Sequence, residues 1–281
     1  MKVQKKLAIG YIRLKLNLLS LISNRKAGQV AFKLFSTPLI RYKGKEADIF
    51  KKAERLEFKI DGKQVKGFRC NAPQPKKVLL LHGFSSTCHK FDKYAIALIE
   101  KGYEVLAFDA PAHGASDGIT VNAVDYSEMI KKATQLYGPV NAFLAHSFGG
   151  IAISLALEQM THTNESKLVL IAPATETKTA IDGAFTLLGI KNKKIRSAMD
   201  DIIFELSGKQ TEWFSVRRAL KNIKADVLWV HDEDDLITPI ADALKVKEDN
   251  LPNVAFLITK GLGHQKIYRE TSVKNSILQF L

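Results

Sequence analysis

A serine, a cluster of acids and a histidine occur in that order, and each follows a short apolar run of the sequence. Ser147 lies in the segment AHSFGG, four acids follow His231 in the segment HDEDD, and His264 ends the segment GLGH. In acyl transfer a serine hydroxyl attacks while a neutral imidazole takes its proton, and a carboxylate fixes the tautomer of that imidazole. These residue types in this order predict nucleophilic catalysis through a covalent acyl-enzyme.

The neighbours of Ser147 fit a nucleophile at a sharp turn between a strand and a helix. Ala145, Gly149 and Gly150 are small, and such a turn needs small neighbours because its backbone is strained and the helix packs close to the strand. The helix expected to begin at Phe148 offers free N–H groups and a dipole that favour developing negative charge. The alternative interpretation is that Ser147 is only the N-cap of this helix.

Two backbone N–H groups, those of Phe84 and Phe148, are the candidates for an oxyanion hole. Phe84 follows His82 and Gly83 at the end of an apolar run, and Gly83 lets a backbone N–H approach a ligand closely. Loss of one oxyanion donor typically costs roughly 3 to 4 kcal/mol of transition-state stabilisation. Without a ligand, the same residues would form an ordinary glycine turn.

Short apolar runs alternate with longer helical patterns through most of the chain. The runs are Lys77–Leu81, Tyr103–Phe108, Pro139–Ala145, Lys167–Ile171, Asp226–Val230 and Val254–Ile258. Such runs are typical of strands buried on both faces of a parallel sheet, and a hairpin turning at Asp61-Gly62 precedes them, between Arg55–Ile60 and Gln64–Cys70. The sequence predicts an α/β fold with a mostly parallel central sheet and helices on both faces. Ligands of such sheets bind beyond the carboxyl ends of the strands, where the candidate residues lie.

The composition is that of an ordinary globular protein. The 281 residues are 46% hydrophobic and 25% charged, with two cysteines, Cys70 and Cys88. This excludes a disordered, collagen-like or disulfide-stapled chain. Because so few cysteines favour a reducing compartment, a cytoplasmic location is expected. The sequence contains no run of 18 uncharged apolar residues, so it predicts no clear membrane-spanning helix.

The net charge of +13 is concentrated at the beginning of the sequence. Residues 1–45 hold eleven Lys or Arg and no Asp or Glu, and the remainder is close to neutral. Since the main body is near neutral and carries no nucleic-acid-binding motif, no nucleic acid is expected as a partner.

Part of this basic segment, Leu7–Ile22, has the periodicity of an amphipathic helix. One face of that helix collects Leu7, Tyr11, Leu14, Leu18, Leu21 and Ile22. The favoured expectation is that this helix packs on the body of the protein or on a second copy. The alternative is peripheral contact of residues 1–45 with the inner face of the membrane, where basic residues meet anionic lipid.

The motifs taken together resemble those of the α/β-hydrolase superfamily, in particular its small-cap lipase, esterase and thioesterase-like members. The resemblance runs from about Arg55 to Leu281. By this resemblance Ser147 matches the nucleophile and His264 the base. Asp235 matches the acid by its spacing from a strand-end histidine, and Asp234 is the alternative.

Further motifs of the resemblance surround this triad. His82-Gly83-Phe84 matches the oxyanion loop, and Asp109–Ser116 matches a mainly structural stretch after the fourth strand. The sequence departs from the pattern where Ala145 and Asp232 replace the usual glycines. A serine at the turn excludes the dehalogenases and epoxide hydrolases of this fold, which use a carboxylate nucleophile. The resemblance implies no cofactor and no metal.

The charge pattern, a stop in the alternation of strands and helices between about Thr175 and Ile223, and the resemblance together divide the chain into parts. Residues 1–52 form the basic N-terminal extension, 53–174 and 224–281 form the hydrolase core, and 175–223 form a helical cap insertion over Ser147. Pockets are mostly apolar, so the cap residues Phe185, Leu188 and Trp213 are expected to bind substrate together with Phe84.

The expected function is hydrolysis of small-molecule carboxylic esters or thioesters of a hydrophobic acyl group, without a cofactor. The same triad also serves peptidase, acyltransferase and lyase chemistry, and the sequence does not separate these. A non-catalytic binding protein that has kept the fold is a further alternative. The sequence does not predict an oligomeric state.

Overall fold

The computed structural model describes residues 2–42 and 44–281, and the chain divides into two compact units. The first, the helical unit, comprises residues 1–37 and 176–214, and the second, the sheet unit, comprises residues 38–175 and 215–281. The described elements of the helical unit are α1 (Lys2–Ile22), α2 (Asn24–Phe35), α7 (Thr177–Leu188), α8 (Lys193–Ser207) and the 3-10 helix η2 (Thr211–Trp213).

The sheet unit contains the strands and the remaining helices. Its strands are β1 (Glu54–Ile60), β2 (Lys63–Cys70), β3 (Lys76–Leu81), β4 (Tyr103–Phe108), β5 (Ala142–His146), β6 (Lys167–Ile171), β7 (Asp226–Asp232) and β8 (Val254–Thr259). Its helices are α3 (Asp48–Lys51), η1 (Cys88–Phe91), α4 (Asp92–Glu100), α5 (Ala123–Tyr137), α6 (Phe148–Leu157), α9 (Val216–Leu220), α10 (Ile240–Glu248), α11 (Gly263–Lys266), η3 (Ile267–Arg269) and α12 (Thr271–Phe280).

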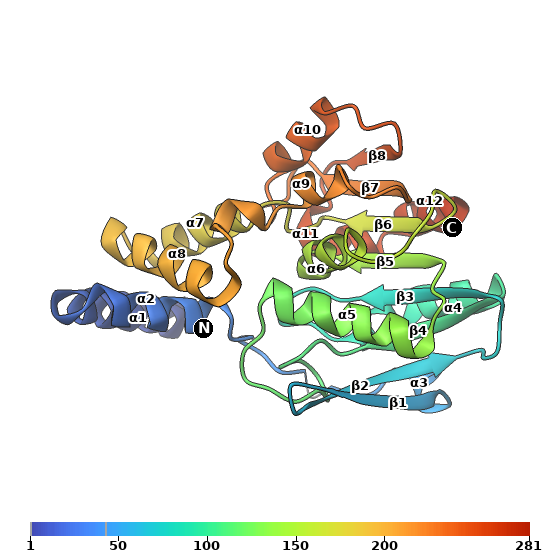
Figure 1. Cartoon of the computed structure of the whole chain (residues 1–281), viewed down its shortest axis with the longest axis horizontal. Helices are drawn as coiled ribbons and strands as arrows, with labels where there is room; N and C mark the ends of the chain where they lie inside the picture. The colour runs from blue at the N-terminus through green and yellow to red at the C-terminus, as the bar shows by residue number, and fades with distance from the viewer. Residues whose placement is uncertain (1, 43) are drawn as a thin grey trace. The chain divides into compact units, whose positions relative to one another are not determined.

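The strands form one sheet in the order β1-β2-β4-β3-β5-β6-β7-β8 (Figure 1). The β1–β2 and β2–β4 pairs are antiparallel, and the other pairs are parallel. Every residue of β4 and β5 is buried, as expected of strands covered on both faces. The predicted α/β class with a mostly parallel sheet is confirmed.

Helices cover both faces of this sheet. On one face Val78 and Leu80 of β3 join an apolar cluster with Tyr94 and Leu98 of α4 and Ile277 of α12. On the other face α5 and α6 pack side by side, in front of the sheet in Figure 1. Because β3 and β5 to β8 are parallel, their carboxyl ends lie at one edge, and the segments that follow them meet there.

Residue types explain the turn between β1 and β2 and the start of β5. Ile60 pairs with Lys63, and the intervening Asp61 and Gly62 have φ angles of 47° and 74°, which fits the Asp-Gly hairpin turn that the sequence predicts. The predicted run Pro139–Ala145 is shorter in the structure, since β5 begins only at Ala142. Pro139 has no N–H to donate to a strand ladder.

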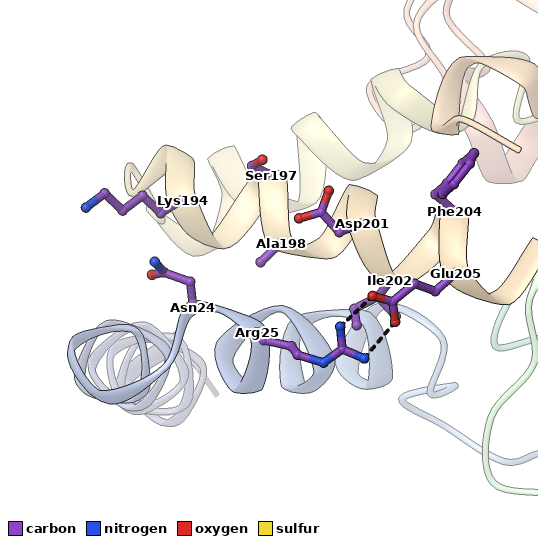
Figure 2. Close-up of a pocket in the computed structure, with 9 residues that line it drawn as sticks. All are labelled: Asn24, Arg25, Lys194, Ser197, Ala198, Asp201, Ile202, Phe204 and Glu205. Atoms are coloured by element: carbon purple, nitrogen blue, oxygen red, sulfur yellow. Dashed lines mark hydrogen bonds and ion pairs between the residues drawn. The ribbon is translucent and has the colours of Figure 1, made fainter. Parts of the chain in front are cut away.

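In the helical unit α2 packs closely on α8. A Cβ added to Gly28 would lie 2.7 Å from the backbone of Ala198, so only glycine permits this approach. The Arg25 guanidinium donates to both carboxylate oxygens of Glu205 across the same pair of helices (Figure 2). A groove of about 630 Å³ between α2 and α8 is lined by mixed polar and apolar side chains of both helices.

The helical unit joins segments that the sequence analysis assigned to different parts of the chain. The prediction placed 1–52 in an extension and 175–223 in a cap, whereas α1 and α2 pack with α7 and α8 in one compact unit. That this unit serves as a cap over Ser147 stays a prediction. None of the helices within the described ranges is long and apolar enough to cross a membrane.

Candidate active site

Ser147 lies at a sharp turn between β5 and α6. Its backbone has φ 55° and ψ −116°, a conformation that costs a non-glycine residue about 1–3 kcal/mol. Close packing leaves no room for larger neighbours, because a Cβ on Gly149 would lie 2.6 Å from the Leu81 carbonyl oxygen, and one on Gly150 would lie 2.6 Å from Pro173. The Ser147 side chain makes no capping hydrogen bond to α6, so the N-cap interpretation does not account for the residue.

His264 and Asp235 meet Ser147 at the carboxyl edge of the sheet. His264 Nε2 lies 3.0 Å from Ser147 Oγ, and His264 Nδ1 lies 2.7 Å from Asp235 Oδ2. If Nδ1 carries the proton, it donates to the carboxylate and Nε2 is free to accept the serine proton. The three residues therefore form the hydrogen-bonded chain that the predicted chemistry requires.

Asp235 is held in its ionised form by four donors. The backbone N–H groups of Ile237 and Thr238 donate to Oδ1, at 2.8 and 2.9 Å, and the Thr238 hydroxyl and His264 donate to Oδ2. Burial by itself raises the pKa of Asp235, but the hydrogen bond and charge of His264 and the two backbone donors lower that pKa to about 2. The alternative acid, Asp234, instead accepts from the Gly261 N–H at 3.0 Å.

The Phe84 and Phe148 backbones flank the turn that carries Ser147. Among the described residues, neither of these N–H groups donates to a protein acceptor. Gly83 lies against the turn, since a Cβ added there would be 3.1 Å from both Ser147 Cβ and His146 Nδ1. The two phenylalanine rings meet edge to face at 5.4 Å and form an apolar surface beside these unpaired donors.

Two neutral histidines hold the loop that contains Phe84. His82 accepts from the Ala110 N–H through Nε2 at 2.9 Å and pairs through Nδ1 with the Gly83 carbonyl. His113 accepts from the Ser85 N–H at 2.9 Å and pairs with the Pro111 carbonyl. An imidazole that accepts at one nitrogen is uncharged. Burial is the main cause that lowers both pKa values, and the pKa of His113 falls to about 3.

The buried neutral state of His113 predicts a loss of stability in acid. Its pKa is about 3 in the folded chain against an ordinary 6.5, so below pH 6.5 the unfolded chain binds the extra proton and unfolding becomes easier. Between pH 7 and pH 5 this one group lowers the free energy of unfolding by about 2 kcal/mol. Urea unfolding at pH 7 and pH 5 measures this change. The free energy of unfolding is expected to fall less between these pH values in His113→Gln than in the wild type, and the glutamine amide oxygen can still accept from the Ser85 N–H. An equal loss in both proteins would contradict this assignment.

Three supporting residues were missed by the sequence analysis. Thr238 bridges the acid and the base, with its hydroxyl 2.8 Å from Asp235 Oδ2 and 3.2 Å from His264 Nδ1. His146 Nε2 lies 3.1 Å from the His264 carbonyl. Asp232 accepts from the Leu262 and Gly263 N–H groups at 3.1 and 2.8 Å.

Asp232 fixes the loop that carries His264. Besides the two backbone donors, it accepts from the Thr259 hydroxyl at 2.7 Å. Burial raises its pKa, and these hydrogen bonds together lower it below the ordinary value. The sequence did mark this position, because Asp232 stands where the resemblance expects glycine. The residues around Asp232 do not show which segment its carboxylate contacts.

The residues expected to bind substrate are divided between the two units. Phe84 lies in the sheet unit beside Ser147. Phe185 is buried in α7, Leu188 is half-buried at the end of the same helix, and Trp213 stacks edge to face with Phe214 at 5.2 Å. A substrate contact by these three residues of the helical unit stays a prediction. Within residues 2–42 and 44–281, no group of three or more His, Cys, Asp or Glu is arranged to hold a metal ion.

Comparison with known proteins decides the family. The sequence model of the family described as serine aminopeptidase, S33, matches residues 72–233, which is more than half of the chain. The chain belongs to this α/β-hydrolase family. The matched segment includes Ser147 and the Phe84 loop. His264 and the acid Asp235 follow it in this α/β hydrolase, and no curated protein sequence matches it significantly.

Solved structures share the fold of this α/β hydrolase at low sequence identity. An esterase from Pyrococcus furiosus is 19% identical with a TM-score of 0.65, covering 88% of this chain and 97% of its own. A candidate lipase from Acinetobacter baumannii is 18% identical with a TM-score of 0.60, covering 82% and 90%. The thioesterase domain from the curacin biosynthetic pathway is 14% identical with a TM-score of 0.57, covering 81% and 98%. The resemblance stated from the motifs is confirmed at the level of superfamily and fold.

Proposed function

We propose that this hydrolase cleaves carboxylic esters or thioesters of a hydrophobic acyl group through an acyl-enzyme on Ser147. The observation that carries the proposal is the continuous chain of hydrogen bonds from Ser147 Oγ through His264 to Asp235, at 3.0 and 2.7 Å. This chain ends at a serine whose neighbouring N–H groups, those of Phe84 and Phe148, lack protein acceptors among the described residues.

The proposed reaction has two halves. Ser147 Oγ attacks the acyl carbon as His264 Nε2 takes its proton, and the oxyanion accepts hydrogen bonds from the Phe84 and Phe148 N–H groups. His264 then protonates the departing alcohol or thiol, leaving the acyl group on Ser147. A water molecule gives a proton to His264, attacks the ester, and the acid leaves as Ser147 regains its proton. Asp235 keeps the imidazole in the required tautomer throughout.

An apolar acyl group is favoured by the side chains nearest the turn. The rings of Phe84 and Phe148 stand edge to face at 5.4 Å, and His113 lies against Phe84 at 5.5 Å in an uncharged state. Such a surface stabilises a hydrocarbon chain by burying its apolar area. The esterase and thioesterase among the structural neighbours agree with this proposal.

A second candidate, release of N-terminal amino acids from peptides, is favoured by the printed description of the matched family. The two candidates differ in the bond that is broken and in the group beside it. An aminopeptidase binds a positively charged amine, for which the aromatic surface of Phe84 and Phe148 supplies no carboxylate.

A substrate series separates these candidates. We expect p-nitrophenyl esters from acetate to dodecanoate to be hydrolysed, with kcat/KM highest for a chain longer than acetate because each buried methylene adds about 0.8 kcal/mol. Amino-acid p-nitroanilides in the same assay serve as the peptidase test. A maximum at acetate would overturn the long-acyl preference, and faster turnover of the anilides would favour the peptidase.

A further inference from the structure

The first helix of the chain has two apolar faces, and the protein covers only one of them. Leu16 of α1 is 1% exposed, and α1 packs on α2, α7 and α8 within the helical unit. The opposite face, which we call the α1 stripe, remains exposed at fractions between 53% and 84%. It consists of Leu7, Tyr11, Leu14, Leu18, Leu21 and Ile22.

The α1 stripe is a continuous surface on a preformed helix. From Leu7 to Ile22 it extends about 22 Å at 1.5 Å per residue, and on a helical wheel its members fall within about 100°. Because α1 is already folded on its packed side, a partner that covers the stripe does not have to order it first. Exposed apolar patches of this kind mark interaction surfaces.

The charge around the α1 stripe identifies the partner. Residues 1–37 contain eight Lys or Arg and no Asp or Glu. On the helical wheel Lys15 follows Ile22 at one edge of the stripe, and Arg13 and Lys6 lie beyond the other edge. Among the described residues, no ion pair engages these three exposed cations.

Three acids of the helical unit pair with cations outside α1. Glu205 pairs with Arg25 of α2, Asp182 pairs with Arg196, and Glu212 pairs with Lys178. Because no ion pair among the described residues engages Lys6 or Lys15, these two cations of α1 remain available to a negatively charged partner.

We propose that the α1 stripe binds the surface of an anionic lipid bilayer, with α1 lying in the plane of the interface. Leucine side chains enter the boundary between headgroups and acyl chains, while the flanking Lys15 and Lys6 reach the lipid phosphates. A second copy of the chain fits this surface less well. It would bring two helices without a single acid into contact, so like charges would face each other.

Vesicle co-sedimentation of the full chain tests the proposal. The two lipid preparations are phosphatidylcholine alone and phosphatidylcholine with about 30% phosphatidylserine. We expect the protein to sediment with the anionic vesicles at low salt and to be released at high salt, with little binding to the neutral ones. Absence of binding to the anionic vesicles at low salt would overturn the proposal.

Two sets of variants separate apolar insertion from charge attraction. Leu14→Glu with Leu18→Glu is expected to weaken binding at least tenfold, and Lys15→Gln about fivefold. Leu187→Glu with Leu206→Glu is the matched control, because both leucines are 66% exposed on α7 and α8. Equal losses in the control and in the stripe variant would overturn the proposal.

Sedimentation velocity without lipid tests whether a second copy of the chain covers the α1 stripe instead. The proposal expects a monomer for the wild type and for both leucine variants. A wild-type dimer that Leu14→Glu with Leu18→Glu converts to a monomer would assign the stripe to self-association and overturn the lipid proposal. Thermal unfolding at unchanged temperature confirms that the variants fold.

Discussion

Replacing Ser147 by alanine is expected to lower kcat for ester hydrolysis by roughly 10⁴- to 10⁶-fold. The methyl group cannot attack an acyl carbon, and the hydroxyl of Ser154 on α6 is buried and donates to the Gly150 carbonyl. The protein should keep its fold, because the only side-chain hydrogen bond of Ser147 among the described residues is the one to His264, and one such bond contributes about 1 kcal/mol to stability.

A fluorophosphonate probe makes this prediction independent of the natural substrate. Intact-mass measurement is expected to show one adduct on the wild type and none on Ser147→Ala, with both proteins unfolding at closely similar temperatures. Equal hydrolysis by wild type and variant would remove the mechanism proposed for this site. Labelling of both proteins would mean that another serine carries the reactivity.

Replacing Asp235 by asparagine is expected to lower kcat by about 10⁴-fold. The amide oxygen can keep the two backbone bonds from Ile237 and Thr238, which leaves its NH₂ group facing His264 Nδ1. The imidazole must then accept at Nδ1 and carry its proton on Nε2. A protonated Nε2 cannot receive the proton of Ser147, so the nucleophile stays inactive although the site is intact.

Asp234→Asn is the matched control for this experiment. Asp234 precedes Asp235 in the same loop. Among the described residues its carboxylate accepts only from the Gly261 N–H, a bond that an amide oxygen can replace. Its kcat is expected to stay within about threefold of the wild type. The kcat values of both variants are measured with the p-nitrophenyl esters. A larger loss of kcat for Asp234→Asn than for Asp235→Asn would make Asp234, and not Asp235, the acid that orients His264.

The strands were predictable because burial on both faces leaves a strong signal in the sequence. The apolar runs at Tyr103–Phe108 and Lys167–Ile171 coincide with β4 and β6. The small residues around Ser147 likewise pointed to a strained turn, since only Gly149 and Gly150 allow α6 to approach β3 and Pro173. These features depend on neighbours in the sequence, and their residue types alone indicate them.

The details of the candidate site depend on contacts between segments that are far apart in the sequence. No local sequence pattern indicates these contacts. Asp234 and Asp235 follow the same strand, so residue type could not separate them. The turn that brings the backbone of Ile237 and Thr238 onto one carboxylate selects Asp235. The roles of Thr238 and His146 as neighbours of His264 arise only when β5, β7 and the loop after β8 converge. Their catalytic consequence remains the proposal made above.

The grouping of α1 and α2 with α7 and α8 was unpredictable for a similar reason. Nothing in the sequence around Gly28 explains a glycine at this position of the helix. The reason is the close approach of Ala198, which leaves no room for a Cβ. No pattern within residues 1–37 indicates a partner that begins at residue 176. From the sequence alone the two segments are therefore expected to be separate parts.

The discontinuity of the helical unit has a consequence for the order in which the protein is made. Residue 37 is added to the growing chain roughly 7 to 28 s before residue 176, at about 5–20 residues per second. During that interval α2 lacks α8, its main packing partner, and both apolar faces of the helix pair are bare. Residues 1–37 thus expose apolar surface that a chaperone or another apolar surface can cover, until the last third of the synthesis of this sequence.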